Sequence, residues 1–518
     1  MSGFHVYDTT LRDGAQQEGV RLTVADKLRI AGFLDQLGVG FIEGGWPGAN
    51  PNDTAFFAAA AERLELRNAV LTAFGSTRKA GVAVADDPLV QALLDAGTQV
   101  VCIVAKSHDE HVYRALKTTL EENLAMVRDT VAHLRRHGRR VFVDCEHFFD
   151  GYRANPEYAM QVVAAAAEAG AEVAVLCDTN GGMLPTGIGP VVAQAAKIGV
   201  QLGIHCHNDT GCAVANTLAA VEAGATHVQG TINGHGERTG NADLITIAAD
   251  LQLKMGRQVL PEGCLAEATR VAHAIAGVVN MPVSGRQPYV GHSAFAHKAG
   301  LHASAIKVDS GLYQHIDPEL VGNGMRMLVS DMAGRANIQI KGEELGYDLS
   351  NRELAARITE TVKARELEGY SYESADASFE LLIRDELGLN QEFFEVVSWR
   401  VLTSHAVSPE GDSEAVVKVA VGGRHEALVG EGQGPLNALD VALRKSLVSA
   451  YPQVESFELT DYRVRILDTG HGTDAVVRTL IDTTDGQRTW TTVGVGTNVI
   501  EASWEALHDA YRWGLQQR

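Results

Sequence analysis

The chain has 518 residues, of which 45% are apolar, and its 44 basic and 65 acidic side chains give a net charge of −21. This composition is typical of a globular protein with more than one domain. The acidic balance argues against nucleic-acid and anionic-membrane partners, which need a basic face. Six scattered cysteines without a C-x-x-C pair predict free thiols in a reducing cytoplasm.

No targeting or membrane-spanning segment is expected. The first apolar run begins at Phe4, which leaves no room for a signal peptide. The most apolar stretch, near residues 160–177, is interrupted by Glu168 and Glu172, whereas a membrane span tolerates few charges. These features predict a cytoplasmic protein.

Eight short apolar runs alternate with helix-like segments through about the first 250 residues. The runs are His5–Asp8, Phe41–Glu43, Val70–Phe74, Val100–Ala105, Val141–Cys145, Val173–Cys177, Leu202–His205 and His227–Ile232. Ala25–Leu37 and Tyr158–Ala169 are two of the intervening helical patterns. Eight βα units in a chain of this length predict a (β/α)8 TIM barrel. A doubly wound open sheet is the alternative, disfavoured because no G-x-G-x-x-G follows the first strand.

Polar side chains follow nearly every predicted strand. They include Arg12-Asp13, Glu43, Ser76, Lys106, Glu146-His147, Asp178-Thr179-Asn180, His205, His207-Asn208-Asp209 and Asn233. In barrel enzymes the active site lies at the carboxyl ends of the strands. We therefore expect an active site at this end.

The pair His205 and His207 predicts a metal site. Residues i and i+2 of a strand face the same side, so both imidazoles should point into the barrel mouth. An H-x-H pair alone is weak evidence, but Asp13, expected on an adjacent strand, completes a 2-His-1-carboxylate set. Asn241 can add an oxygen ligand, cap the next helix, or do both. Mg²⁺ or Mn²⁺ is favoured, and Zn²⁺ also suits two imidazoles.

Four motifs together resemble those of the DRE-TIM metallolyases. They are DTTLRDG (8–14), HCHND (205–209), GERTGNADL (236–244) and GHSAFAHKAGLHAS (291–304). Within that family the chain resembles the synthases that join an acyl-CoA to a 2-oxoacid: the isopropylmalate, homocitrate and citramalate synthases. Segments 42–51 and 146–152 are most similar to the long citramalate synthases. Gly44 and Trp46 stand where isopropylmalate synthases tend to have valine and phenylalanine.

The resemblance implies a metal-dependent Claisen-type condensation. Acetyl-CoA and pyruvate would give (R)-citramalate and CoA, in isoleucine biosynthesis. The resemblance assigns the metal ligands to Asp13, His205, His207 and, as a fourth, Asn241.

The resemblance also implies roles for residues around the metal. Arg12 would stabilise the alkoxide that develops on the oxoacid, with Glu43 beside it. Thr179 would bind the substrate carboxylate. Glu146 and His302 would act together in removing a proton from the acetyl-CoA methyl group, for which a positioned base is needed.

His302 lies outside the barrel sequence, in a glycine-flanked segment. We expect it to reach the mouth of a barrel, that of a partner chain, and hence a homodimer. A structural loop histidine is the alternative, because His292 and His297 are close by. Tyr313 is a candidate for the tyrosine that other members place beside this histidine.

The sequence divides into three expected parts: a catalytic barrel (1–275), a helical connecting region (276–373) and an α+β regulatory domain (374–518). In the last part, 414–418 matches 474–478, a weak repeat with a period of 60. Glycine-rich turns at 430–434 and 493–497 each precede a helix, and helix N-termini bind small carboxylates. The resemblance implies isoleucine as a feedback effector; a pure dimerisation domain is the alternative.

Three other functions stay open. One is a 2-isopropylmalate synthase that uses 2-oxoisovalerate for leucine biosynthesis. Another is a lyase on the same barrel, although a simple lyase has no need of a regulatory tail. The third is a catalytically inactive amino-acid sensor, against which the intact Asp13, His205 and His207 set argues.

Overall fold

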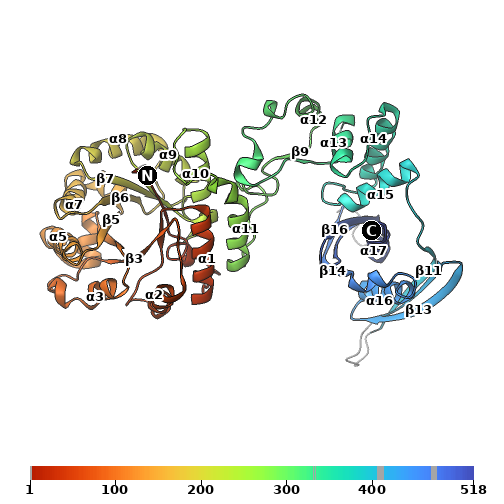
Figure 1. The fold of residues 1–518 in the computed structure, drawn as a ribbon, viewed down its shortest axis with the longest axis horizontal. Coiled ribbons are helices and arrows are strands. Elements are labelled where there is room, and N and C mark those ends of the chain that lie inside the picture. Colours follow the sequence, from red (N-terminus) through yellow and green to blue (C-terminus); the bar gives the residue numbers. More distant parts are fainter. Residues whose placement is uncertain (1–2, 331, 333, 405–412, 468–474, 518) are drawn as a thin grey trace. The chain divides into compact units, whose positions relative to one another are not determined.

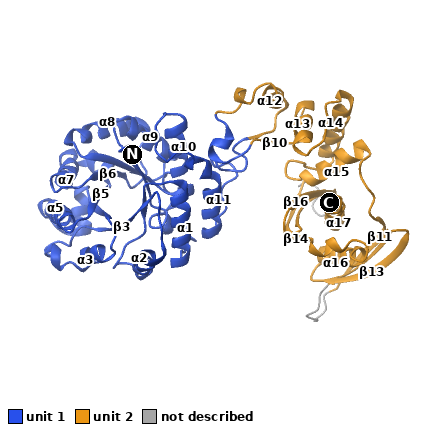
Figure 2. Ribbon diagram, viewed as in Figure 1, with its two compact units in different colours: residues 1–295, 316–324 blue, residues 296–315, 325–518 orange. Residues whose placement is uncertain are grey.

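The structure, a computed structural model, describes residues 3–330, 332, 334–404, 413–467 and 475–517 (Figure 1). The chain forms two compact units, Met1–Phe295 with Ile316–Gly324, and Ala296–His315 with Met325–Arg518 (Figure 2). The expected domain boundaries near 275 and 373 stay a prediction. Among the described helices, none combines the length and apolar content needed to cross a membrane.

Eight parallel strands close into a barrel in the first unit, in the order of the sequence. They are β1 (His5–Asp8), β2 (Phe41–Glu43), β3 (Val70–Ser76), β4 (Val100–Lys106), β5 (Arg140–Glu146), β6 (Val173–Asp178), β7 (Gln201–Cys206) and β8 (His227–Gly230). The barrel closes where β1 pairs with β8 along His5–Asp8 and His227–Gly230. The predicted (β/α)8 barrel is confirmed, and the open-sheet alternative is wrong.

Helices surround this barrel (Figure 1). The main ones are α1 (Val24–Leu37), α2 (Pro51–Arg63), α3 (Pro88–Asp95), α5 (Leu120–Arg136), α7 (Pro156–Glu168), α8 (Pro185–Ala195), α9 (Ala213–Glu222), α10 (Leu244–Leu253) and α11 (Ala268–Val279). Short helices α4 (Asp109–His111) and α6 (Phe148–Ala154) follow β4 and β5. Helix α1 shows why these boundaries arise: Thr23 and Asp26 form a capping box, and Gly38 ends the helix in the left-handed region.

The barrel interior is packed rather than open. Rings of Phe41 and Phe142 meet edge to face at 5.2 Å, and Tyr7 lies against both. Val100, Val173 and Val175 fill the remaining space in this cluster. Toward the carboxyl ends of the strands, polar side chains replace these apolar ones.

The second unit begins with a helical region. It contains β9 (Ala296–His297) paired with β10 (Arg326–Met327), then α12 (Gly300–Ile306), α13 (Arg335–Glu344), α14 (Arg352–Leu367) and α15 (Asp376–Leu387). Two three-stranded antiparallel sheets follow. The first has β11 (Glu395–Thr403), β12 (Ser413–Val421) and β13 (Arg424–Gly432), followed by α16 (Pro435–Leu447). The second has β14 (Glu458–Ile466), β15 (Val477–Thr484) and β16 (Thr489–Gly496), followed by α17 (Val499–Gln516).

The two βββα modules confirm an internal duplication but correct its period. A Cβ on Gly430 would meet the backbone of Ala438 and Ala442, and one on Gly494 would meet that of Ala502 and Ala506. Equivalent positions are therefore 64 residues apart, not 60. The matched segment 474–478 precedes the true counterpart of 414–418, and residue 474 lies outside the described residues.

Candidate functional site

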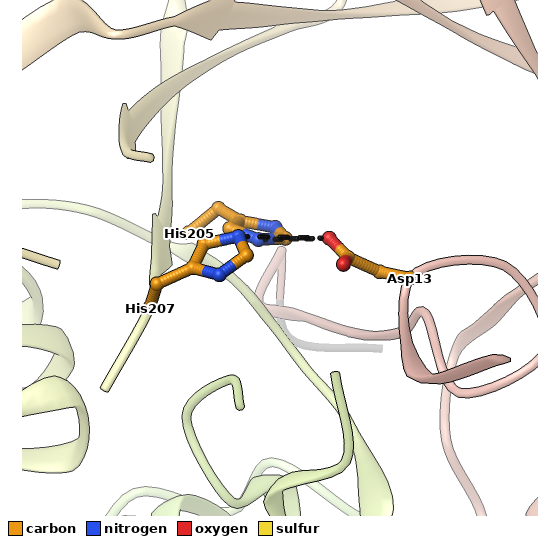
Figure 3. A group of neighbouring side chains, drawn as sticks. All are labelled: Asp13, His205 and His207. Atoms are coloured by element: carbon orange, nitrogen blue, oxygen red, sulfur yellow. Dashed lines mark ion pairs between the residues drawn. The ribbon is translucent and has the colours of Figure 1, made fainter. Parts of the chain in front are cut away.

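Asp13, His205 and His207 meet at the carboxyl end of the barrel (Figure 3). Asp13 Oδ2 lies 3.3 Å from Nε2 of His205 and 3.8 Å from Nε2 of His207. The two histidines are on and just after β7, and share a side as their spacing predicts. Asp13 follows β1. The expectation that this strand is adjacent to β7 is wrong, because β8 lies between them. The set therefore spans a three-strand arc of the mouth.

Asp13 and His207 are in the protonation states that suit metal ligation, whereas His205 must lose a proton to bind an ion. All three side chains are buried. Burial opposes ionisation of Asp13, but Arg12 and the two imidazoles outweigh it and hold the pKa of Asp13 well below its ordinary value. Burial and the neighbouring His205 lower the pKa of His207 to about 4, so this imidazole is neutral at pH 7. Burial also lowers the pKa of His205, but the contact with Asp13 outweighs this effect and raises the pKa to about 8.

Asn241 Oδ1 is a buried acceptor next to the set and has no hydrogen-bond partner among the described residues. Asn241 pairs with His207 through the backbone, and its Nδ2 donates to the His235 carbonyl at 3.1 Å. A buried polar atom without a partner is costly. A cation between Asp13, His205 and His207 would offer positive charge to this oxygen. The residues present thus fit a divalent metal ion.

Arg12 and Glu43 are brought together as predicted. The Arg12 Nη2 lies 3.5 Å from Asp13 Oδ2, and its Nε donates to Glu43. Tyr7 donates to the other Glu43 oxygen at 2.5 Å, and the guanidinium carbon lies 3.9 Å from the centre of the Phe74 ring. The guanidinium is therefore fixed on one side by a carboxylate and on one face by an aromatic ring.

Thr179 and Glu146 lie at the ends of β6 and β5. Thr179 Oγ1 accepts a hydrogen bond from the backbone N–H of His147 at 2.8 Å. His147 adopts φ 55, in the left-handed region, which turns its N–H toward Thr179. Because the Thr179 oxygen accepts this hydrogen bond, the hydrogen of its hydroxyl is free to donate. The Glu146 carboxylate pairs with Lys106 on the neighbouring strand β4.

His302 lies on α12 in the second unit, so its predicted action with Glu146 stays a prediction. The structure does place Tyr313 beside it, with ring centroids 4.2 Å apart and planes inclined by 30°. His297 is the other neighbouring ring, at 6.1 Å. The candidate tyrosine is therefore in contact with the histidine.

A cavity of about 630 Å³ adjoins Arg12. Trp46 lines it and meets the Phe74 ring edge to face at 5.5 Å. The Trp46 indole N–H is buried without a partner among the described residues. A second cavity, of about 430 Å³, lies in the second unit, lined by Gly434, Pro435, Leu436, Asn437, Asp440, Leu459, Tyr462 and Ile500.

Sequence reasoning missed two buried polar residues behind the histidines, Gln229 on β8 and Asp144 on β5. Both interrupt apolar runs, and Gln229 follows His227 by two, so the pair faces one side of the strand. The available signal was a second polar residue on the same face of a strand that is otherwise apolar. The sequence does not show that this face lies inside the barrel, because the apolar residues alone predict the strand.

Three family models match consecutive parts of the chain. Residues 4–273 match the HMGL-like model, and residues 289–368 match the homocitrate synthase post-HMGL domain-like model. Residues 373–514 match the LeuA allosteric (dimerisation) domain. The order of the three is that of the barrel, the helical region and the duplicated modules.

Full-length relatives agree with these matches. An (R)-citramalate synthase of Streptomyces coelicolor is 64% identical over 99% of this chain and 96% of its own. One of Aquifex aeolicus is 49% identical over 99% of this chain and 98% of its own. A probable 2-isopropylmalate synthase of Methanopyrus kandleri is only 32% identical, over 97% of this chain and 96% of its own.

Proposed function

The chain belongs to the (R)-citramalate synthase family, and from that premise we propose that it condenses acetyl-CoA with pyruvate to give (R)-citramalate and CoA. It is an acyltransferase built on an HMGL-like barrel. The observation that carries the proposal is the convergence of Asp13, His205 and His207 beside Arg12. Asp13, His205 and His207 would hold a divalent ion, and a set of two imidazoles and one carboxylate would leave the ion accessible to substrate.

The metal ligands in this proposal are Asp13, His205 and His207, with Asn241 Oδ1 as a fourth. When bound, the ion supplies Lewis-acid polarisation of the oxoacid keto group. Mg²⁺ or Mn²⁺ suits the oxygen-donating substrate, and Zn²⁺ also suits two imidazoles.

The side chains around the ligands handle charge and orientation. The Arg12 guanidinium stabilises the negative charge that develops on the keto oxygen, and Glu43 holds it there. The Thr179 hydroxyl donates to the substrate carboxylate, since its oxygen is engaged by the His147 N–H. His302, with Tyr313 against its ring, removes the methyl proton of acetyl-CoA, and Glu146 accompanies it in proton transfer.

Two features of the second unit are the basis for proposing regulation and assembly. The match of residues 373–514 to the LeuA allosteric (dimerisation) domain supports a homodimer. In the proposed dimer one chain's His302 serves its partner's barrel. The 430 Å³ cavity at Gly434 and the start of α16 supports an isoleucine site, because backbone N–H groups at a helix start suit a carboxylate while Leu459 and Ile500 suit an aliphatic side chain. The turn at 493–497 does not line this cavity. The setting proposed is cytoplasmic isoleucine biosynthesis.

The test is CoA release from acetyl-CoA with a panel of 2-oxoacids. We expect pyruvate to be preferred over 2-oxoisovalerate, because the bulky Trp46 side chain, packed against Phe74, lines the cavity beside Arg12. Steric exclusion can discriminate strongly, whereas one methylene contact is worth only about 1–3 kcal/mol. Turnover with 2-oxoisovalerate that equals or exceeds that with pyruvate would reassign the chain to the isopropylmalate synthases. Absence of CoA release with every oxoacid, together with cleavage of a hydroxy acid, would favour the lyase.

A further inference from the structure

We infer that Gln229 is a positioning residue that fixes the tautomer in which His205 presents Nε2 to the metal site. The inference concerns the hydrogen bonds behind the ligands and rests on the proposed function only in treating His205 as a ligand. Gln229 lies on β8, directly across from His205 on β7, and is fully buried.

Three contacts surround the Gln229 amide. Its Oε1 lies 2.8 Å from His205 Nδ1. Its Nε2 lies 3.0 Å from Asp144 Oδ1 and 3.3 Å from His227 Nε2. The amide thus connects a metal-site histidine on β7 to a buried carboxylate on β5.

The amide can be oriented from its partners. Burial raises the pKa of Asp144, and the ionised form of this carboxyl only accepts hydrogen bonds. Burial lowers the pKa of His227 well below its ordinary value, so that imidazole is neutral and can accept. The two hydrogens of the amide nitrogen satisfy these two acceptors. Reversing the amide would place its carbonyl oxygen against both of them.

This orientation decides the proton position on His205. A carbonyl oxygen facing Nδ1 requires Nδ1 to carry hydrogen, so the neutral ring keeps its lone pair on Nε2. Nε2 is the atom that faces Asp13. A metal-ligating histidine commonly donates its other N–H in this way, and loss of such a partner typically costs about 10–100-fold in metal affinity. A proton on Asp144 would permit the reverse amide and the opposite tautomer, and the experiment distinguishes the two.

His207 gives an internal contrast. Its Nδ1 is buried and has no partner among the described residues. Nothing described fixes its tautomer from behind, so substitutions at Gln229 should leave the His207 ring signals unchanged.

The first measurement uses metal-free Asp13→Ala protein, because the Asp13 carboxylate 3.3 Å from Nε2 would otherwise favour a proton on that atom. With ¹⁵N-labelled histidine at alkaline pH, where the ring is neutral, we expect His205 to show protonated Nδ1 and unprotonated Nε2, the signal being assigned by its loss when His205→Gln is added. Adding Gln229→Met, which keeps the side-chain length but removes both hydrogen-bonding groups, should turn His205 into a mixture of tautomers. Protonated Nε2 in Asp13→Ala with Gln229 intact would overturn the inference.

The second measurement is calorimetric titration with Mn²⁺. Gln229→Met should raise the dissociation constant by about 10–100-fold. Val228→Ala is the matched control, because Val228 is equally buried on the same strand but faces the outer core, so it should lower stability without changing Mn²⁺ affinity. Equal Mn²⁺ affinities for Gln229→Met and the unsubstituted protein would also overturn the inference.

A compensating pair separates positioning from general packing. Gln229→Glu combined with Asp144→Asn rebuilds an acceptor facing His205 and a donor facing residue 229. This double variant should regain most of the affinity lost in Gln229→Met, whereas failure to regain any would assign the loss to packing. If the unsubstituted protein binds no divalent ion, the proposed function fails, while the tautomer measurement still tests Gln229.

Discussion

The barrel and the duplicated modules differ in which side chains they bury and which they expose. The barrel buries ionisable groups: Asp13, Glu43, Asp144 and His205 are each no more than 5% exposed. The modules expose apolar ones: along β14, Leu459, Tyr462, Val464 and Ile466 are 36–55% exposed. Buried charge that is held by partners is typical of a reaction centre, and an exposed apolar strand is typical of an interface.

Topology explains the difference. A closed barrel has no edge strand, so its backbone is fully paired and its strand ends are free to carry side chains into one mouth. Each three-stranded sheet has two edges, and β14 is one of them. An edge strand with apolar side chains invites a second chain. On this comparison the metal site belongs to the barrel and assembly is expected of the second unit, with His302 the one proposed catalytic residue outside the barrel. Five measurements can break or sharpen that division.

The largest effect should follow loss of a metal-site histidine. In His207→Ala the set loses one of its two imidazoles, so we expect metal content to fall below stoichiometric and CoA release to be abolished. Elemental analysis of the purified protein and the CoA assay check this. His137→Ala, at the end of α5, serves as the control. Full metal content and full activity in His207→Ala would place the site elsewhere.

The next effect tests whether chemistry is confined to the barrel. His302 is in the second unit, and as a general base it should contribute about 10²–10⁴-fold. His302→Ala should block exchange of the acetyl-CoA methyl protons with D₂O, and Tyr313→Phe should slow it less. Undiminished exchange would show that the base belongs to the barrel.

Arg12→Ala should lower kcat by about 10²–10³-fold, because one partner of the developing oxyanion is lost. The KM for pyruvate should change less than kcat if the interaction strengthens in the transition state. Steady-state kinetics check this, with Arg29→Ala on the exposed side of α1 as the matched control. A KM increase with unchanged kcat would instead make Arg12 a ground-state binding residue.

A moderate effect should come from isoleucine acting through the modules. A coupling of about 1–3 kcal/mol would weaken substrate affinity or rate by about 5–150-fold. Tyr462→Ala, at the cavity in the second unit, should reduce this inhibition while leaving uninhibited turnover intact. Isothermal titration of the whole enzyme and inhibition assays check it. Simple competition with pyruvate, unaffected by Tyr462→Ala, would place the effector in the barrel.

The smallest effect on turnover should come from Asp8, whose burial raises its pKa to about 7. The folded state then binds a proton more tightly than the unfolded chain. Asp8 therefore contributes most to the free energy of unfolding below about pH 4, and its contribution falls as the pH rises to about 7. Asp8→Asn should remove this contribution to the pH dependence. Denaturant titrations at several pH values check it, with Asp95→Asn on the surface of α3 as the control; an unchanged slope would contradict it.

Sequence patterns sufficed for the barrel and for the residues at its mouth. β1 and β2 match their predicted bounds, because apolar runs flanked by turns can lie only in the sheet. The run at His227–Ile232 was too long: β8 ends at Gly230, where a Cβ would strike the Ala242 backbone. That approach comes from a loop after the strand and leaves no local trace in the sequence.

Two other features were beyond local patterns. The similar sequences EAVVK and DAVVR predict a repeat period of 60. Strand pairing and the glycine contacts show that equivalent residues of the two modules are 64 positions apart. Gln229 was missed because its role depends on hydrogen bonds to three side chains on three strands. Side-chain networks across a barrel depend on register, which the sequence shows only after the strand order is known.

The duplication has a consequence for ancestry. The cavity in the second unit takes Gly434, Asn437 and Asp440 from the first βββα module, and Leu459, Tyr462 and Ile500 from the second. Neither copy alone encloses it. A one-module ancestor would have needed a second polypeptide to form such a hollow, whereas two joined copies form it within one chain. Joining them would also let the two walls diverge independently.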